Sequence, residues 1–470
     1  MKKSRKIWVR RAAAIAVMDD SRRVLRDADL VCEGPVVTEV GRDLHVEDAD
    51  EVIDASGKVV LPGFVNVHHH LYQTLCRAIP RVEDVKLFDW LTDLYQVWRH
   101  LTPEAVQVSA MVGMGELLLT GCTTTSDHFY VFPEGRDPHL LDRTVEAAQA
   151  IGMRFCVTRG SMSRGQSKGG LPPDDVVQDE ETILADSLRV IERFHDPRPL
   201  AMCQVALAPC SPFSVTPDLM KETAALARDK GVRLHTHLAE TLDEEAYCLD
   251  NHGKRPLAFM EDLGWVGPDV WYAHGVHFND EEVALLAQTG TAVAHCPSSN
   301  LRLGSGIARV VDLTEAGVTV GLAVDGSASN DSSDMLAEVR LAMLLHRVAS
   351  GVDRISALDA LWLATRGGAA VLGREDIGSL EPGKAADFSL WSLDDIAYAG
   401  AGADPVGALL FCNARSRAQA VFVHGQQVVR EGRLARLDES DLVAEHNQRA
   451  ASMLSKAEES TGLDYHRPRG

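Results

Sequence analysis

Short apolar runs and amphipathic stretches alternate along the middle of the chain. Eight of these runs are typical of strands, and the segments between them show the apolar periodicity of helices. The predicted strands are Val59–Asn66, Thr123–Asp127, Arg154–Thr158, Gln204–Ala208, Arg233–His237, Val270–His274, Ala292–Cys296 and Val318–Val324. The clearest helices are Pro103–Leu119, with Thr102 as its N-cap, Pro217–Lys230, Glu281–Gln288 and Asp334–Arg347. Eight strand–helix units predict an α/β fold, a (β/α)8 TIM barrel, in which functional residues gather at the carboxyl ends of the strands.

The two ends of the chain have a different pattern, in which short strands are separated by turns. Residues 7–58 contain three such runs, and Ala386–Trp391 and Ala420–Gly425 look the same. Neither end has enough strands for a core of its own, so we expect the two ends to pair. The predicted organisation is a composite β-sandwich domain of residues 1–58 and 375–440, a barrel of residues 59–374, and a C-terminal helix and tail of residues 441–470.

Composition and charge narrow the class of protein. The 470 residues are 45% hydrophobic and 24% charged, as in an ordinary globular protein. The net charge of -21 argues against a nucleic-acid partner, which calls for a basic surface. We see neither a membrane span nor a signal peptide, and the nine cysteines without a CxxC pair suggest reduced thiols. We therefore expect a cytoplasmic protein with a small-molecule partner, and we leave association into a homo-oligomer open.

Histidines and one aspartate end the predicted strands at four places. His68 and His70 end the first strand, and side-chain alternation points both the same way. His237, His274 and Asp325 end the fifth, sixth and eighth strands. In a barrel these side chains converge at one mouth. The metal-ligand set His68, His70, His237 and Asp325 then offers three nitrogens and one oxygen, which suits one Zn²⁺ and which Fe²⁺ also tolerates.

Each of these residues also has a structural interpretation. A single histidine at a strand end is more often hydrogen-bonded than a metal ligand, and Asp325-Gly326 is also a turn sequence. The coincidence at four strand ends favours the metal site. His235 shares a face with His237 and competes with it, and we prefer His237 because it lies nearer the strand end. The remaining histidines near these motifs are expected to be structural or to face the substrate: His69, His277 and His295.

The motifs resemble those of the amidohydrolase superfamily and, within it, the aminohydrolase branch of deaminases and triazine hydrolases. The segments that carry the resemblance are Leu61–His70, His237 with Glu240, Ala273–Gly275, Cys296–Gly306, Val324–Gly326 and Leu380–Asp387. Similarity is greatest to the deaminases of 8-oxoguanine, through His70–Leu75, Leu87–Leu91, Thr158–Ser163, Ala208–Ser214 and Asp325–Asp331. Val67 and His69 depart from the threonines common at these positions, which changes the neighbourhood of the metal and removes no ligand.

The resemblance implies a zinc-dependent hydrolytic deaminase of a purine-like ring, acting on 8-oxoguanine to give urate and ammonia. Glu240 is expected to protonate the ring nitrogen beside the reacting carbon. Asp325 is expected to pass the proton of water to the departing ammonia, and His274 to stabilise the developing charge. The alternative substrates are isoxanthopterin, guanine and an s-triazine. The alternative class is a barrel subunit without catalysis.

Substrate contacts are expected from Gln73, Arg159 and Trp90. Gln73 can offer both a donor and an acceptor to a base edge. Arg159 can donate to a carbonyl or form a structural ion pair, and Trp90 can stack on a planar ring or belong to the core. One metal is predicted rather than two, because the fourth strand end lacks the bridging lysine of two-metal relatives. Cys210, at that end, is expected to be a core or substrate-side thiol rather than a bridge.

Overall fold

The computed structural model describes residues 4–412 and 417–469. In this part of the chain, eight parallel strands follow one another in sequence order as neighbours in one sheet. They are β6 (Phe64–Asn66), β7 (Cys122–Phe129), β8 (Arg154–Ser161), β9 (Cys203–Pro209), β10 (Arg233–Leu238), β11 (Val270–His274), β12 (Ala292–His295) and β13 (Val320–Leu322). The two edge strands also meet, because the Val67 amide donates to the Leu322 carbonyl at 3.3 Å and the Val324 amide donates to the Asn66 side chain at 2.9 Å. The sheet therefore closes into a barrel, and the predicted fold class is confirmed.

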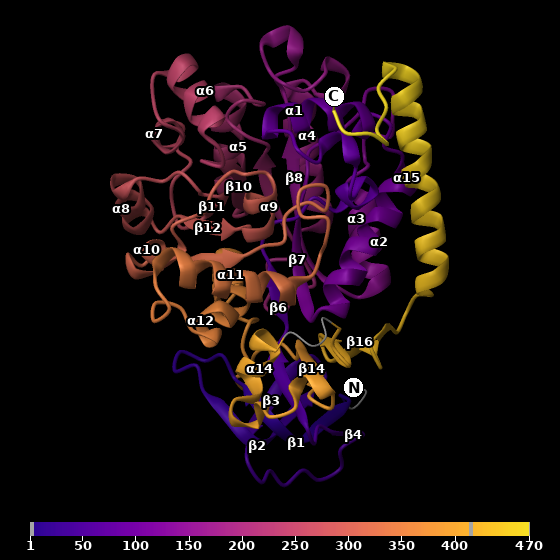
Figure 1. Cartoon of the computed structure of the whole chain (residues 1–470), viewed down its shortest axis with the longest axis vertical. Helices are drawn as coiled ribbons and strands as arrows, with labels where there is room; N and C mark the ends of the chain where they lie inside the picture. The colour runs from indigo at the N-terminus through magenta and orange to yellow at the C-terminus, as the bar shows by residue number, and fades with distance from the viewer. Residues whose placement is uncertain (1–3, 413–416, 470) are drawn as a thin grey trace.

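Helices cover the outside of the barrel (Figure 1). The predicted helix start at residue 103 is confirmed, since Pro103 opens α2 and the Thr102 side chain accepts the Ala105 amide. The helices of the barrel are α1 (Leu87–Trp98), α2 (Pro103–Leu119), α3 (Asp142–Ile151), α4 (Glu180–Phe194), α5 (Pro217–Lys230), α6 (Leu242–His252), α7 (Pro256–Asp262), α8 (Asp280–Thr289), α9 (Pro297–Arg302), α10 (Val310–Glu315), α11 (Met335–Ser350), α12 (Ala357–Trp362) and α13 (Gly368–Val371). Short 3-10 turns lie between them, among which η1 (Leu71–Cys76) follows the first barrel strand.

Strands from both ends of the chain form a second sheet, nine-stranded within the same described ranges. Its members are β1 (Lys6–Ala16), β2 (Val24–Glu33), β3 (Val36–Gly41), β4 (Glu51–Asp54), β5 (Lys58–Pro62), β14 (Phe388–Ser392), β15 (Ala420–Val423), β16 (Gln426–Arg430) and β17 (Arg433–Leu434). The two ends join where β5 pairs antiparallel with β14. This sheet has its own apolar core, in which Phe388 stacks on Phe422 with ring centroids 4.5 Å apart. The expected pairing of the two chain ends is confirmed.

The predicted strand Val59–Asn66 is wrong as one element, because the chain changes sheets at Gly63. Residues before Gly63 belong to β5 of the small domain, and residues after it form β6 of the barrel. A Cβ atom at Gly63 would lie 2.0 Å from the Thr123 hydroxyl, so this crossing point has no room for a side chain. The predicted domain division at residue 59 stays a prediction, and the pairing of β5 favours a boundary near Gly63.

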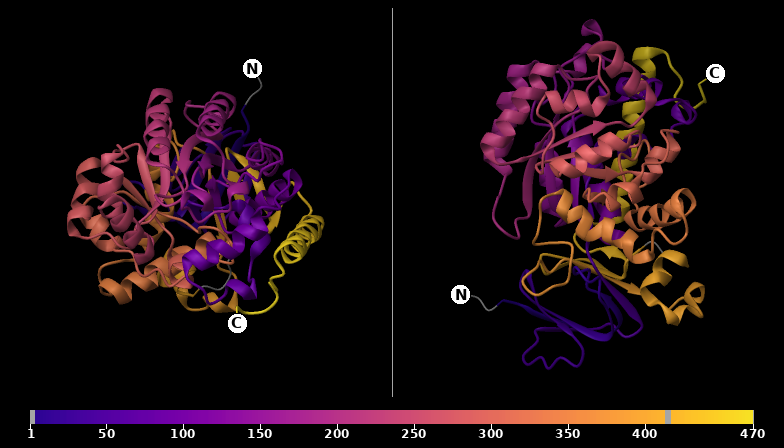
Figure 2. Two further views of the ribbon diagram at one scale, coloured as in Figure 1. Left: turned by 90° about the horizontal axis from the view of Figure 1, so that it is seen from above. Right: turned by 90° about the vertical axis from the view of Figure 1, so that its left-hand side faces the viewer.

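The small domain lies against the amino ends of the barrel strands (Figure 2). At the start of β8, the buried Arg154 guanidinium donates to both Asp387 oxygens, at 2.9 and 3.1 Å. Asp387 immediately precedes β14, so this ion pair joins the two domains. Because the small domain occupies the amino ends, the carboxyl ends of the strands face the opposite way.

The last helices lie outside both sheets. α14 (Pro405–Phe411) follows β14, and the long α15 (Glu439–Thr461) runs beside α2 on the outer wall of the barrel (Figure 1). His446 of α15 reaches η1, where its Nε2 atom lies 3.0 Å from the Thr74 hydroxyl. The predicted C-terminal helix is thus present from Glu439 and packs on the segment that follows the first barrel strand. No helix of the described residues has the length and apolar character that a membrane span requires.

Candidate metal centre and active site

The strand ends bring the predicted metal ligands together at the mouth of the barrel. His68 and His70 follow β6, His237 ends β10 and Asp325 follows β13. The Nε2 atoms of His70 and His237 lie 3.1 Å apart. The Asp325 Oδ1 atom lies 3.2 Å from His68 Nε2 and 3.4 Å from His70 Nε2. Four ligand atoms from three different strand ends thus face one another in a buried space.

The hydrogen bonds of His70 and His237 determine which ring nitrogen carries a proton. His70 Nδ1 lies 2.7 Å from the His128 carbonyl, and His237 Nδ1 lies 2.6 Å from the Cys210 carbonyl. A carbonyl oxygen only accepts, so both Nδ1 atoms must be the donors. Each Nε2 atom therefore keeps its lone pair, and the two lone pairs point toward each other.

A relay through His235 gives His68 the same tautomer. His235 Nδ1 donates to the Trp271 carbonyl at 3.0 Å, which leaves His235 Nε2 as an acceptor. That atom lies 2.7 Å from His68 Nδ1, which must be the donor. His68 Nε2 then keeps a lone pair, and it has no hydrogen-bond partner among the described residues. The same contacts favour His237 over His235 as the ligand from β10. His237 Nε2 faces the Nε2 atom of His70, whereas His235 contacts the other ring nitrogen of His68.

This donor set fits a divalent cation. Three imidazole lone pairs and a carboxylate oxygen repel one another in a buried site unless a positive charge lies between them. Burial lowers the pKa of His68, His70 and His237, which favours the neutral form that binds metals.

Strained backbone and short hydrogen bonds hold Asp325 in place. Its φ of 62° is in the left-handed region, which a non-glycine residue seldom adopts. Oδ1 accepts the Gly326 amide at 2.7 Å, and Oδ2 accepts the Ser329 hydroxyl at 3.1 Å. The carboxylate is therefore fixed at the mouth independently of the histidines.

A second buried pair, Glu240 and His274, lies beside these ligands. His274 Nε2 is 3.6 Å from Glu240 Oε2, and His274 Nδ1 is 2.9 Å from the Asn300 side-chain oxygen. Burial raises the pKa of Glu240. Burial alone would lower the pKa of His274, but the charges of Glu240 and Asp325 raise it overall. Both groups are therefore candidates for proton transfer to a molecule in the site.

A small cavity opens over these groups. Gln73 and Trp90 lie in its wall together with Glu240 and His274. The full set of lining residues is His70, Gln73, Leu87, Trp90, Leu91, Tyr130, Cys210, Ser211, Phe213, His237, Glu240, His274, Leu303, Asp325 and Ser329. A Cβ atom at position 326 would lie 1.9 Å from the Gln73 oxygen, so Gly326 leaves the space that Gln73 occupies. Apolar side chains line this cavity together with three of the predicted ligands, His70, His237 and Asp325.

The structure places Arg159, which the sequence predicted to bind substrate, away from this cavity. Arg159 is fully buried, and the described residues that line the cavity do not include it. Its guanidinium donates to Asp186 at 2.7 Å and to Gln178 at 2.8 Å, and it stacks on Phe132 at 4.0 Å. Because neighbouring residues of a strand face opposite sides, this position of β8 points toward α4 rather than the mouth. The alternative of a structural ion pair describes its contacts.

Sequence reasoning missed His128, which lies among the ligands. Its ring nitrogens belong to a group in which the ligand atoms of His68, His70, His128 and His237 lie within 4.8 Å of one another. His128 Nε2 donates to the Ala208 carbonyl at 2.7 Å, and its Nδ1 atom has no partner among the described residues. The predicted second strand ended one residue earlier, at Asp127. A histidine at a strand end is the same signal that identified His237.

The other residues singled out from the sequence lie around this centre. Cys210 lines the cavity, and burial raises the pKa of its thiol to about 12. His69 Nε2 points away from the ligands to the Ser333 hydroxyl at 3.0 Å. His277 contacts the Ser305 carbonyl at 2.9 Å, and His295 contacts His346 at 3.0 Å. Of the two expected roles of these histidines, structural or facing the substrate, those contacts favour the structural one.

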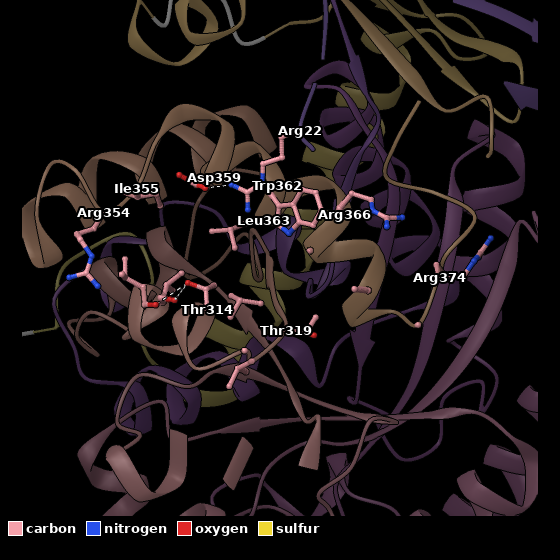
Figure 3. A pocket seen from close by; sticks show the side chains of 18 of the residues that line it. Arg22, Thr314, Thr319, Arg354, Ile355, Asp359, Trp362, Leu363, Arg366 and Arg374 are labelled. Atoms are coloured by element: carbon pink, nitrogen blue, oxygen red, sulfur yellow. Dashed lines mark hydrogen bonds and ion pairs between the residues drawn. The ribbon is translucent and has the colours of Figure 1, made fainter. Parts of the chain in front are cut away.

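A larger cavity of about 590 Å³ lies elsewhere, at the amino end of β13 (Figure 3). Arg22, Arg366 and Trp362 form part of its wall. Each of its lining arginines pairs with a carboxylate, among them Arg22 with Asp359 and Arg366 with Asp20. The cavity at the histidines is smaller. Of these two cavities, it is the one that combines potential metal ligands with groups that can transfer protons.

Comparison with known proteins places the chain in a family. The model described as "Amidohydrolase family" matches residues 59–428. The chain is 47% identical to 8-oxoguanine deaminase of Pseudomonas aeruginosa over 456 residues, which cover 95% of this chain and 99% of that protein. It is 38% identical to hydroxydechloroatrazine ethylaminohydrolase of Pseudomonas sp. strain ADP, covering 89% and 88%. The crystal structure of atrazine chlorohydrolase TrzN from Arthrobacter aurescens TC1 with zinc has a TM-score of 0.90 at 37% identity, covering 94% of this chain and 100% of that one. The chain belongs to the amidohydrolase family.

Proposed function

We propose that this protein is a zinc-dependent hydrolytic deaminase of an aminated, purine-like heteroaromatic ring, and that its substrate is 8-oxoguanine, converted with water to urate and ammonia. The observation that carries the proposal is the convergence of three imidazole lone pairs and the Asp325 carboxylate beside the buried pair of Glu240 and His274. The similarity to the deaminase of Pseudomonas aeruginosa supports the choice of substrate.

His68, His70, His237 and Asp325 would hold the metal. Zn²⁺ in such a set makes water nucleophilic near neutral pH. The tautomers argued above support this assignment, because all three histidines present Nε2 with Nδ1 already engaged. His235 is proposed to orient His68, since it accepts the Nδ1 proton and is itself fixed by the Trp271 carbonyl.

The remaining groups move protons. Water adds to the ring carbon that bears the amine, so the neighbouring ring nitrogen must gain a proton as that carbon becomes tetrahedral. Glu240, whose buried carboxyl has a raised pKa, is proposed to deliver it. Asp325 takes one proton of the attacking water and returns it to the amine, which leaves as ammonia, and the second proton of that water passes from the tetrahedral hydroxyl to Glu240 and restores its carboxyl. His274 stabilises the developing charge, and its Nδ1 contact with Asn300 keeps Nε2 directed toward Glu240.

Gln73 and Trp90 are proposed to bind the ring. Both lie in the cavity wall, where Phe213 adds a second aromatic surface. The Gln73 side chain has a donor and an acceptor for a lactam edge. The indole N–H of Trp90 is buried and has no acceptor among the described residues, so a substrate carbonyl could satisfy it. A flat ring with several carbonyl and N–H groups matches this wall better than an aliphatic amide does.

A second candidate is a different ring with the same chemistry. The likeness to a chlorohydrolase and to an ethylaminohydrolase of triazines favours an s-triazine. Isoxanthopterin and guanine are further members of this group. In each case the metal and the proton-transferring residues act identically, and only the fit to Gln73, Trp90 and Phe213 differs.

The test is a panel of 8-oxoguanine, isoxanthopterin, guanine and chlorinated or aminated triazines, with release of ammonia or chloride as the readout. We expect the highest kcat/KM for 8-oxoguanine and about one zinc per chain. A preference for a triazine would overturn the proposed substrate and keep the reaction class. A chain that binds no stoichiometric zinc or iron and releases no ammonia would favour the non-catalytic alternative.

A further inference from the structure

A glutamate of helix α6 reaches back to the segment that carries Glu240. Glu244 is the third residue of α6, and its side chain is 1% exposed. Its Oε1 atom accepts the Ala239 amide at 2.9 Å, and its Oε2 atom accepts the Glu240 amide at 2.9 Å. One carboxylate thus binds two successive backbone N–H groups, and one of these belongs to the proposed proton donor.

This contact differs from the capping box of an ordinary helix start. In α8, the N-cap is Asn279, and Glu282 at the third helical position accepts the amide of that N-cap at 2.9 Å. In α6 the N-cap is Thr241, whose hydroxyl accepts the Glu244 amide at 3.4 Å. The Glu244 carboxylate passes over Thr241 and binds the two residues before it, so it fixes the strand end and not only the helix.

The backbone at this strand end needs such a partner. Ala239 has φ of 53°, in the left-handed region that a residue with a Cβ atom seldom occupies. Successive N–H groups next to a left-handed residue point the same way and form a small anion-binding concavity. The Glu244 carboxylate occupies that concavity. On its other side, the Ala239 carbonyl accepts the Val276 and His277 amides at 2.9 and 3.0 Å, so the residue is held from the next strand as well.

The position of the Glu240 side chain depends on this backbone. Its carboxylate lies 3.6 Å from His274, which is longer than a hydrogen bond, so the direction of this side chain also depends on the backbone that carries it. We propose that Glu244 is a positioning residue, whose carboxylate clamps the Ala239 and Glu240 amides and so aims the Glu240 carboxyl at the ring nitrogen of the substrate. This inference rests on the proposed role of Glu240, and Glu244 itself does not contact the substrate cavity.

The test compares Glu244→Gln with Glu282→Gln in the zinc-loaded protein. Both changes replace a buried carboxylate at a helix start by an amide of the same shape. Only in Glu244→Gln does the new side-chain NH2 group face the backbone N–H of Ala239 or Glu240, so that one of these two hydrogen bonds is lost. For Glu244→Gln we expect kcat to fall about 10- to 100-fold, with KM within about threefold of wild type and zinc content unchanged. For Glu282→Gln we expect a similar loss of Tm and a kcat close to wild type.

Amide hydrogen exchange gives a readout that needs no substrate. We expect the Ala239 and Glu240 amides to be protected in the wild type and to exchange at least about tenfold faster in Glu244→Gln, with the amides of β10 unchanged. Glu244→Asp keeps the charge but is one methylene too short to reach both amides, and it serves if the glutamine variant does not fold. We expect it to show the same exchange and the same loss of kcat.

Two outcomes would overturn the inference. One is a wild-type kcat in Glu244→Gln, and the other is unchanged exchange of the two amides. If Glu240→Gln is fully active, the proposed role of Glu240 fails, and with it the catalytic part of the clamp. If the wild type turns over no substrate of the panel, the proposed function fails, and exchange alone decides whether Glu244 holds this backbone.

Discussion

His235 Nε2 lies 2.7 Å from His68 Nδ1, and the Trp271 carbonyl fixes the other nitrogen of the His235 ring. The His235 ring also stacks on Trp271, with centroids 4.4 Å apart. Two buried aromatic residues that do not face the other ligand atoms therefore determine which nitrogen His68 presents to them. The orientation of a metal-binding imidazole that follows β6 is thus set by side chains of β10 and β11.

Replacing His235 should weaken metal binding without removing a ligand. In His235→Ala, the His68 Nδ1 proton loses its acceptor, so the ring can rotate or change tautomer. We expect zinc affinity to fall by about 10- to 100-fold, measured by competition with a chelator of known affinity. His45→Asn, an exposed histidine of the small domain, is the control and should bind zinc as the wild type does. Unchanged affinity in His235→Ala would rule out the relay.

Replacing Glu240 should separate metal binding from turnover. Glu240→Gln retains the shape of the side chain but has no proton to deliver at neutral pH. We expect full zinc content, a Tm close to wild type and a loss in kcat of about 100-fold or more on the best substrate of the panel. Asp243→Asn, an exposed acid nearby on α6, should retain activity. Wild-type turnover by Glu240→Gln would remove this residue from the mechanism.

The ion pair of Arg159 should matter for stability and not for substrate affinity. Asp186→Ala leaves a fully buried guanidinium without its closest carboxylate, and breaking a buried pair in this way costs about 3 to 5 kcal/mol. We expect a lower free energy of unfolding in denaturant and an unchanged KM for the protein that remains folded. An increase in KM at unchanged stability would instead return Arg159 to the substrate site.

The buried Glu338 should make stability depend on pH. Burial raises the pKa of Glu338 from its ordinary value of 4.5 to about 7, although its oxygens accept the Ser298 amide at 3.2 Å and the Asn330 side chain at 2.8 Å. Between these two values the folded state binds more protons than the unfolded chain. The contribution of this group to the free energy of unfolding therefore falls as pH rises through that range.

Glu338→Gln resembles the protonated carboxyl and should lack this dependence. We expect the Tm of Glu338→Gln relative to the wild type to be higher at about pH 8 than at about pH 5.5, in thermal unfolding of the zinc-loaded proteins. Glu375→Gln, at an exposed glutamate, should show no such change. The assignment fails if the difference in Tm between Glu338→Gln and the wild type is constant, or falls, as pH rises.

Much of the fold and of the candidate site follows from local patterns. Buried parallel strands are rich in apolar residues, so strands such as β11, β12 and β13 can be recognised by their composition, and a histidine or aspartate at or just beyond their ends stands out. Thr102 and Pro103 mark a helix start by their own backbone chemistry. The sequence alone predicts six site residues that stand at or just beyond a strand end: His68, His70, His237, Glu240, His274 and Asp325.

Only the tertiary structure decided which of these residues face one another and which support them. Arg159 and the ligands occupy similar places in the sequence, but the pleat of β8 turns Arg159 outward to Asp186. His235 and His237 lie on one face of one strand, and only the contacts with His68 and His70 distinguish them. Glu244 is one of three acids in the first turn of α6, and only the structure shows that its carboxylate accepts the amide of the left-handed Ala239. A sequence pattern shows how a residue relates to its neighbours along the chain. Histidine tautomers, ion pairs and the contact of Glu244 with the backbone depend on atoms that the fold brings together from separate segments.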